Sequence, residues 1–94
     1  MRQFKKGDVV KIREYNPKSQ RFFDYNAYGK TATIVGFSKF FGHALELTDP
    51  SFEGIECDGL VPSKRGQWAD DQDLELSKYQ VIKDFVEAIK TLTL

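Results

Sequence analysis

Short stretches in which apolar and polar residues alternate recur along the chain, as they do in β-strands that bury one face. The first stretch is Val9 to Glu14, which follows a glycine turn and places Val10 and Ile12 on the same face. The second, about Thr31 to Phe37, follows another glycine turn and has the same phase. Two short strands of equal phase, joined by a long loop, predict a small β-barrel.

The same alternation predicts the later strands. Ser38 to Gly42 is the expected tip of a hairpin, and His43 to Thr48 returns as a third strand with its leucines facing inward. Ile55 to Val61 and Gln67 to Ala69 are both candidates for the fourth strand, and the pattern does not decide between them. A brief closing strand is predicted at Leu74 to Leu76.

The end of the chain has a helical period. Ser77 is a suitable N-cap, and the segment from Tyr79 to Leu92 separates into an apolar and a polar side. The apolar side holds Val81, Ile82, Phe85, Val86, Ala88, Ile89 and Leu92. An amphipathic helix with so wide an apolar face must bury it, either against the barrel or against another copy of the protein.

The turn and strand motifs resemble those of the small SH3-like β-barrels, which include KOW-type domains and the barrel of nitrile hydratase β subunits. The positions concerned are Gly7, Asp8, Val10, Ile12, Gly29, Lys30, Ala32, Ile34 and Asp73 to Leu76, with Asn16, Pro17, Arg21 and Tyr25 for the nitrile hydratase barrel. The resemblance implies a mainly β (α+β) fold. Residues 1–76 would form a small SH3-like five-stranded barrel, and residues 77–94 a C-terminal helix packed on it, in one domain overall. Since this barrel hosts many activities, it implies no single function.

Length and composition narrow the range of functions. A chain of 94 residues, 40% hydrophobic and 30% charged, suits one folded domain with little interior for a substrate cavity. Its apolar runs are far shorter than a bilayer requires, so we expect no membrane association. The single Cys57 fits a reducing compartment, and a cytoplasmic location is expected.

Charge is unevenly distributed along the chain, although the net charge is zero. Residues 1–39 contain nine Lys and Arg against three Asp and Glu, whereas residues 40–94 contain five against eleven. If the two halves occupy different surfaces, the molecule has a basic and an acidic side that orient a charged partner. If strands of both halves alternate in the sheet, the charges pair locally instead.

No cluster of residues indicates catalysis or metal binding. His43 and Cys57 are the single histidine and the single cysteine, so a zinc site lacks further soft ligands. A Cys57 nucleophile would lie beside the acidic Asp58, which disfavours the thiolate, and a cysteine in a β-rich segment is more often core filler. We therefore expect a non-enzymatic protein without metal or cofactor.

Aromatic and basic residues gather in the long loop and at the hairpin tip, which we predict to be adjacent at one rim of the barrel. The candidate partner-binding residues are Lys18, Arg21, Phe22, Tyr25, Tyr28, Lys39, Phe40 and Phe41. Aromatic and arginine side chains are typical anchors of protein interfaces, so we expect a protein partner of unknown identity. The compact single domain is also similar to small phage-encoded proteins, and a regulator or inhibitor is expected.

Two alternatives stay open. In the first, a KOW-like domain binds nucleic acid by stacking bases on aromatic rings while cations follow the phosphates. Those cations are Lys11, Arg13, Lys18, Arg21, Lys30 and Lys39. In the second, copies of the chain associate through the C-terminal helix. The protein is then a homodimer, and without this association it is a monomer.

Overall fold

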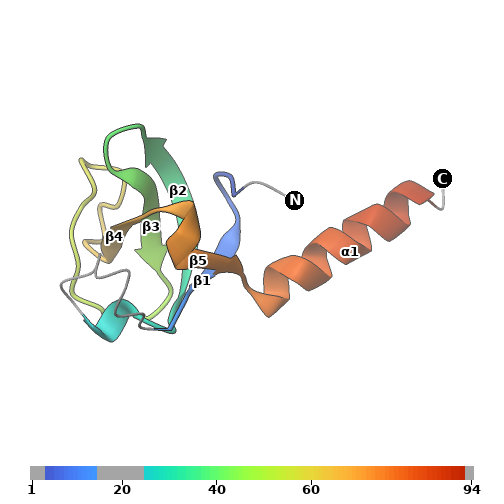
Figure 1. Cartoon of the computed structure of the whole chain (residues 1–94), viewed down its shortest axis with the longest axis horizontal. Coiled ribbons are helices and arrows are strands. Elements are labelled where there is room, and N and C mark those ends of the chain that lie inside the picture. Colours follow the sequence, from blue (N-terminus) through green and yellow to red (C-terminus); the bar gives the residue numbers. More distant parts are fainter. Residues whose placement is uncertain (1–3, 15–24, 93–94) are drawn as a thin grey trace.

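The protein forms a five-stranded antiparallel sheet followed by one helix (Figure 1). The structure, a computed structural model, describes residues 4–14 and 25–92. The strands in these ranges are β1 (Val9–Ile12), β2 (Thr31–Ser38), β3 (Gly42–Leu47), β4 (Gly66–Ala69) and β5 (Leu74–Leu76). Their order in the sheet is β4-β3-β2-β1-β5. The remaining elements are the 3-10 turns η1 (Tyr25–Ala27) and η2 (Asp71–Asp73) and the helix α1 (Lys78–Leu92). The expected mainly β (α+β) class, with five strands followed by a C-terminal helix, is confirmed.

The core lies on the face of the sheet that the apolar alternation predicts. Val10 and Ile12 of β1, Ile34 of β2, and Leu45 and Leu47 of β3 are all fully buried. They belong to one cluster, against which the partly buried Phe4 and Tyr28 pack. Burial of each large aliphatic side chain stabilises the fold by about 1.5–3 kcal/mol.

The segment between β3 and β4 packs on the other side of the sheet. Cys57 and Val61 form a second buried cluster with Ala44, and Val35 and Trp68 pack against it. This segment is not the fourth strand, because Cys57 has a positive φ of 48° and the chain turns there. Ile55 contributes an isolated bridge to Gly66, and the fourth strand is Gly66–Ala69.

Gly36 marks a bulge in β2, as the sequence predicted. The register with β3 shifts between Ile34 and Gly36. Leu60 covers this position so closely that a Cβ on Gly36 would lie 2.8 Å from its Cδ1 atom. A glycine therefore allows the β3–β4 segment to approach the sheet.

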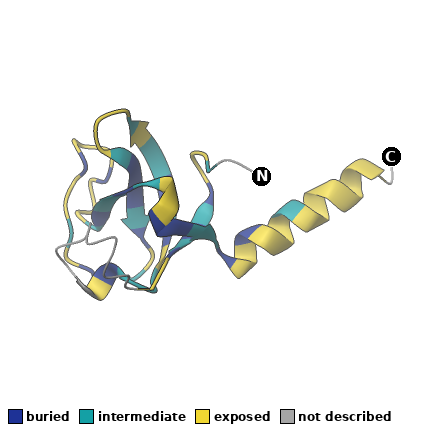
Figure 2. Ribbon diagram, in the orientation of Figure 1, coloured by how far each residue is buried: buried dark blue, intermediate teal, exposed yellow. Residues whose placement is uncertain are grey.

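The helix begins where the sequence predicts, but it does not lie along the sheet. The Gln80 backbone N–H donates to Ser77 Oγ at 3.1 Å, which confirms Ser77 as the N-cap. We expected the helix to pack on the barrel; instead it projects from the sheet and touches β1 through its first turn (Figure 1). Of helix residues 78–92, Gln80 alone is buried, and the predicted apolar face is exposed (Figure 2).

Within the described ranges there is no helix with the length and apolar character that spanning a bilayer requires.

Candidate protein-binding surface

The two groups of the predicted rim lie at opposite ends of β2. Tyr25 begins η1 and Tyr28 precedes β2, whereas Lys39, Phe40 and Phe41 follow it (Figure 1). An eight-residue strand rises about 3.3 Å per residue, which separates its ends by roughly 25 Å. Of the other expected members, Lys18, Arg21 and Phe22 lie outside the described residues. The structure therefore does not join Tyr28 and the hairpin tip into one rim.

The hairpin tip holds its aromatic side chains in an ordered turn. Ser38 Oγ accepts hydrogen bonds from the backbone N–H groups of Phe40 at 3.1 Å and Phe41 at 3.3 Å. Phe37, Phe40 and Phe41 are 65%, 81% and 49% exposed. Because a turn stabilised by its own serine loses little entropy on binding, these rings are well placed to anchor a partner.

Contacts on both sides of the tip position these rings. The Phe41 ring lies 5.3 Å from that of Trp68 on β4, in a tilted arrangement. The Lys39 ammonium lies 5.6 Å from the centre of the Phe40 ring, within the range of a cation–π contact. The tip thus combines exposed apolar area with a positive charge.

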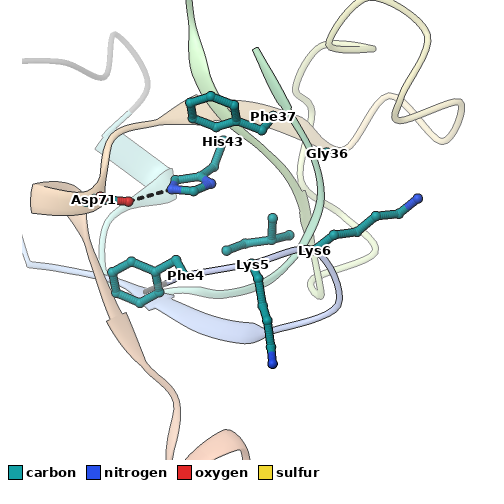
Figure 3. Close-up of a pocket in the computed structure, with 8 residues that line it drawn as sticks. Phe4, Lys5, Lys6, Gly36, Phe37, His43 and Asp71 are labelled. Atoms are coloured by element: carbon teal, nitrogen blue, oxygen red, sulfur yellow. Dashed lines mark hydrogen bonds and ion pairs between the residues drawn. The ribbon is translucent and has the colours of Figure 1, made fainter. Parts of the chain in front are cut away.

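A pocket of about 430 Å³ adjoins the tip (Figure 3). The His43 ring lies between two phenylalanines, with centroids 6.2 Å from Phe4 and 5.2 Å from Phe37. Ile34 contributes further apolar lining. Phe37 belongs both to the pocket and to the hairpin, so the two features form one continuous surface.

Polar groups of this pocket come from three separate segments. His43 Nε2 and Asp71 Oδ1 form a hydrogen bond of 2.5 Å, in which the nitrogen donates because a carboxylate only accepts. The other ring nitrogen, Nδ1, is buried without a hydrogen-bond partner among the described residues. Lys5 and Lys6 line the edge, and their side chains extend outward from the pocket (Figure 3).

We define the hairpin surface as the exposed tip together with this pocket. Its members are Phe4, Lys5, Lys6, Phe37, Lys39, Phe40, Phe41, His43 and Asp71. Sequence reasoning found Lys39, Phe40 and Phe41 but missed the others as site residues. Phe37 had a signal, since the second strand was expected to end there, beside the hairpin tip. The pairing of His43 with Asp71, 28 residues away, had none.

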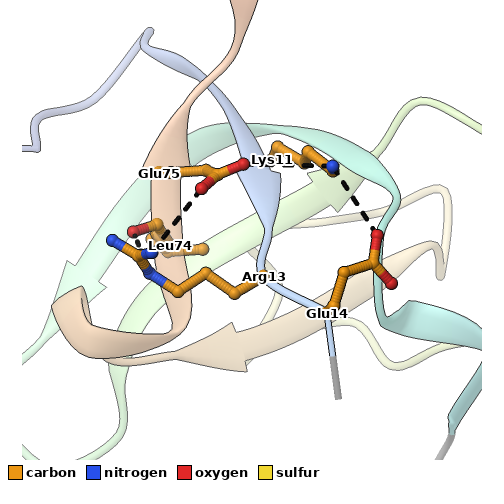
Figure 4. A network of polar contacts seen from close by, with 5 residues as sticks. All are labelled: Lys11, Arg13, Glu14, Leu74 and Glu75. Atoms are coloured by element: carbon orange, nitrogen blue, oxygen red, sulfur yellow. Dashed lines mark hydrogen bonds and ion pairs between the residues drawn. The ribbon is translucent and has the colours of Figure 1, made fainter. Parts of the chain in front are cut away.

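Most of the cations of the nucleic-acid alternative that the structure describes are paired with carboxylates. Lys11 Nζ lies 3.6 Å from Glu14 and 3.9 Å from Glu75, and Arg13 lies 3.5 Å from Glu75 (Figure 4). The Arg13 guanidinium also donates to the Leu74 carbonyl at 3.1 Å. Strands from the basic and acidic halves are neighbours in the sheet, so these charges pair locally. This agrees with the second of the two expectations for the charge distribution.

Lys30, which directly precedes β2, is also paired with a carboxylate. Its ammonium donates to Asp49 Oδ2 at 2.6 Å. This bond, with the hydrogen bonds from Ser51, holds the pKa of the Asp49 carboxyl well below its usual range. Lys39, by contrast, lies at the opposite end of the strand, so these four cations do not follow a single phosphate track.

Cys57 behaves as core filler. Its side chain is buried, and burial, together with the neighbouring Asp58, raises the pKa of the thiol to about 11. A thiol of this kind is protonated and unreactive at neutral pH.

This burial predicts slow alkylation of Cys57. At pH 8 the raised pKa leaves about 100-fold less thiolate than an ordinary cysteine has, so iodoacetamide should react at least about 100-fold more slowly with the folded protein. The measurement is mass spectrometry of the adduct over time, with the chain in denaturant as the control. Equal rates in the two conditions would contradict the buried placement.

Comparison with known protein families, with curated proteins and with solved structures finds no match to this chain.

Proposed function

We propose that this chain is a non-enzymatic binding module that docks a protein partner through the hairpin surface. The observation that carries the proposal is the exposure of Phe40 and Phe41 on a turn held by Ser38, next to the exposed Phe37 of β2. Exposed aromatic side chains on an ordered scaffold are the usual anchors of protein interfaces. A small regulator or inhibitor is the role that such a module fits, and a phage-encoded origin belongs to the same proposal.

The chemistry of the hairpin surface favours a partner with an apolar side chain beside acidic groups. The pocket between Phe4 and Phe37 accommodates an apolar or aromatic side chain, since its lining is mostly apolar. Lys5, Lys6 and Lys39 lie around the same surface and attract carboxylates.

The nucleic-acid alternative has less support. Three of its four described cations, Lys11, Arg13 and Lys30, already have carboxylate partners. Neutralised side chains release few counterions on binding, and counterion release supplies most nonspecific affinity for nucleic acids. The hairpin surface remains the better candidate because the side chains of Lys5 and Lys6 extend away from Asp71, the one acidic residue among the described residues that line the pocket.

The assignment to the SH3-like barrels is also part of the proposal. It is supported by the strand order β4-β3-β2-β1-β5, in which β1 to β4 pair in the order of the chain and β5 pairs with β1. Such a barrel would present hairpin tips as its binding elements.

The test is a pull-down from cell extract with nuclease and high salt, comparing the wild-type protein with Phe40→Glu. Phe40 makes few contacts of its own, so this change leaves the fold intact and places a charge at the centre of the surface. We expect a partner captured by the wild-type protein to bind the variant at least about 30-fold more weakly, the effect of losing one interface anchor.

Ile55→Glu is the matched control, because Ile55 is also an exposed apolar residue but belongs to the β3–β4 segment. Capture that survives Phe40→Glu would refute the hairpin surface as the docking site. Recovery of nucleic acid alone, released by salt, would favour the KOW-like alternative.

A further inference from the structure

The apolar face of α1 points away from the sheet because the opposite side of the helix is attached to it. Gln80 Oε1 accepts the backbone N–H of Val9 at 2.9 Å, and Ser77 Oγ donates to the Val9 carbonyl at 2.8 Å. Both backbone polar groups of one β1 residue are therefore bound by the start of the helix. Gln80 Nε2 also donates to Asp84 Oδ1 at 3.0 Å, which fixes the side chain along the helix.

This attachment determines the rotation of the helix about its axis. Successive residues are about 100° apart, so Ile89 lies roughly opposite Gln80, and Ile82 and Phe85 lie on either side of Ile89. The sheet holds the Gln80 side and cannot also cover the Ile89 side. In agreement, the large apolar residues from Tyr79 to Leu92 are 42–84% exposed.

An exposed face of this size needs an occupant. Seven large apolar side chains at these exposures, where a full aromatic side chain buries 150–250 Å², offer on the order of 800 Å². That is about the area that each partner contributes to a stable protein interface. A 15-residue helix without such cover is also marginally stable in water.

We propose that a second copy of this chain covers the face, through contact between the α1 helices. Ile82, Phe85, Ile89 and Leu92 follow the alternating spacing of three and four residues that lets two equal helices interlock. Val81, Val86 and Ala88 widen this stripe beyond a two-helix seam. Helices with an apolar stripe of this width pack in bundles, so the association of two or more copies would bury it.

The polar side of α1 argues against a lipid surface as the occupant. Helices that lie in membrane interfaces carry an excess of Lys and Arg on their polar face. Here Lys83 and Lys90 are matched by Asp84 and Glu87, and Lys90 pairs with Glu87 at 3.7 Å. With Lys78 at its start, α1 has an excess of one positive charge. The face therefore fits a protein helix better than anionic lipid.

The test is the molar mass in solution, measured by sedimentation equilibrium for the wild-type protein, Phe85→Glu and Glu87→Lys. We expect the wild-type protein to reach at least twice the 10.8 kDa mass of one chain. Phe85→Glu places a charge in the contact and should raise the dissociation constant about 100-fold or more. Glu87→Lys changes charge on the polar side and should associate like the wild-type protein.

Phe85 is exposed in the single chain, so its replacement does not compromise the core, and Trp68 fluorescence verifies that the sheet is folded. A wild-type protein that is monomeric at high concentration would overturn the proposal, as would association that survives Phe85→Glu. Binding of the monomer to anionic phospholipid vesicles, lost in Phe85→Glu, would assign the face to a membrane instead. Phe40→Glu should leave the mass unchanged, which separates this contact from the hairpin surface.

Discussion

Replacing Gly66 by alanine should lower the free energy of unfolding by about 2–3 kcal/mol or more. A Cβ at this position would clash with the Ile55 carbonyl oxygen and lie 2.9 Å from Cys57 Sγ and 3.1 Å from Val61 Cβ. The backbone cannot retreat without losing the two hydrogen bonds of 2.9 Å between Ile55 and Gly66. Urea denaturation followed by Trp68 fluorescence measures the loss.

Gly59→Ala is the matched control. Gly59 has a φ of +87° but nothing within 4 Å of a built Cβ, so alanine there costs only backbone strain, about 1–2 kcal/mol. The Gly66 variant tests the effect of a steric clash at a residue with an ordinary φ. The Gly59 variant tests the effect of a positive φ at a residue without close neighbours. If Gly66→Ala were as stable as the wild-type protein, the β3–β4 segment could not lie where the structure places it.

Leu45→Ala should cost about 2–5 kcal/mol, because it leaves a cavity in the main core. Leu45 is fully buried in β3, opposite Ile34 of the neighbouring strand. Domains of this size have a total stability of about 5–15 kcal/mol, so the variant should unfold at a much lower denaturant concentration. The midpoint of guanidinium denaturation, followed by circular dichroism, measures the shift.

Leu60→Ala removes the same atoms from a side chain that is 43% exposed, and should cost about 1 kcal/mol or less. If both leucine variants lost a similar free energy of unfolding, Leu45 would not be more deeply buried than Leu60, which would contradict the placement of the core.

The strands of the main core could be predicted because each has a period of two. Val10 and Ile12 flank Lys11, and Leu45 and Leu47 likewise flank Glu46, so the core face follows directly. The bulge at Gly36 was also predictable, since glycine in a strand marks a close approach of another backbone or side chain.

The fourth strand could not be predicted, because burial does not distinguish a strand from a packed turn. Cys57 and Val61 are buried like strand residues, but they reach the sheet from a turn with positive φ. The actual strand, Gly66–Ala69, has one glycine and one glutamine among its four residues and shows little apolar signal.

The candidate site could be predicted only in part, because it depends on contacts between residues that are far apart in the sequence. Phe40 and Phe41 could be proposed as binding residues from the sequence, but the pocket depends on contacts between distant segments. The helix was predicted as amphipathic, whereas its orientation depends on the bonds from Ser77 and Gln80 to Val9. A helical wheel shows which residues share a face but not which face the sheet holds.

The two edge strands of the sheet are short. β5 has three residues and β4 has four, and the outer edge of β4 is bridged by Ile55. An open edge with so few free backbone groups offers little template for pairing with another chain. The short edges therefore disfavour edge-to-edge polymerisation into fibrils and leave contacts between side chains as the main route to assembly.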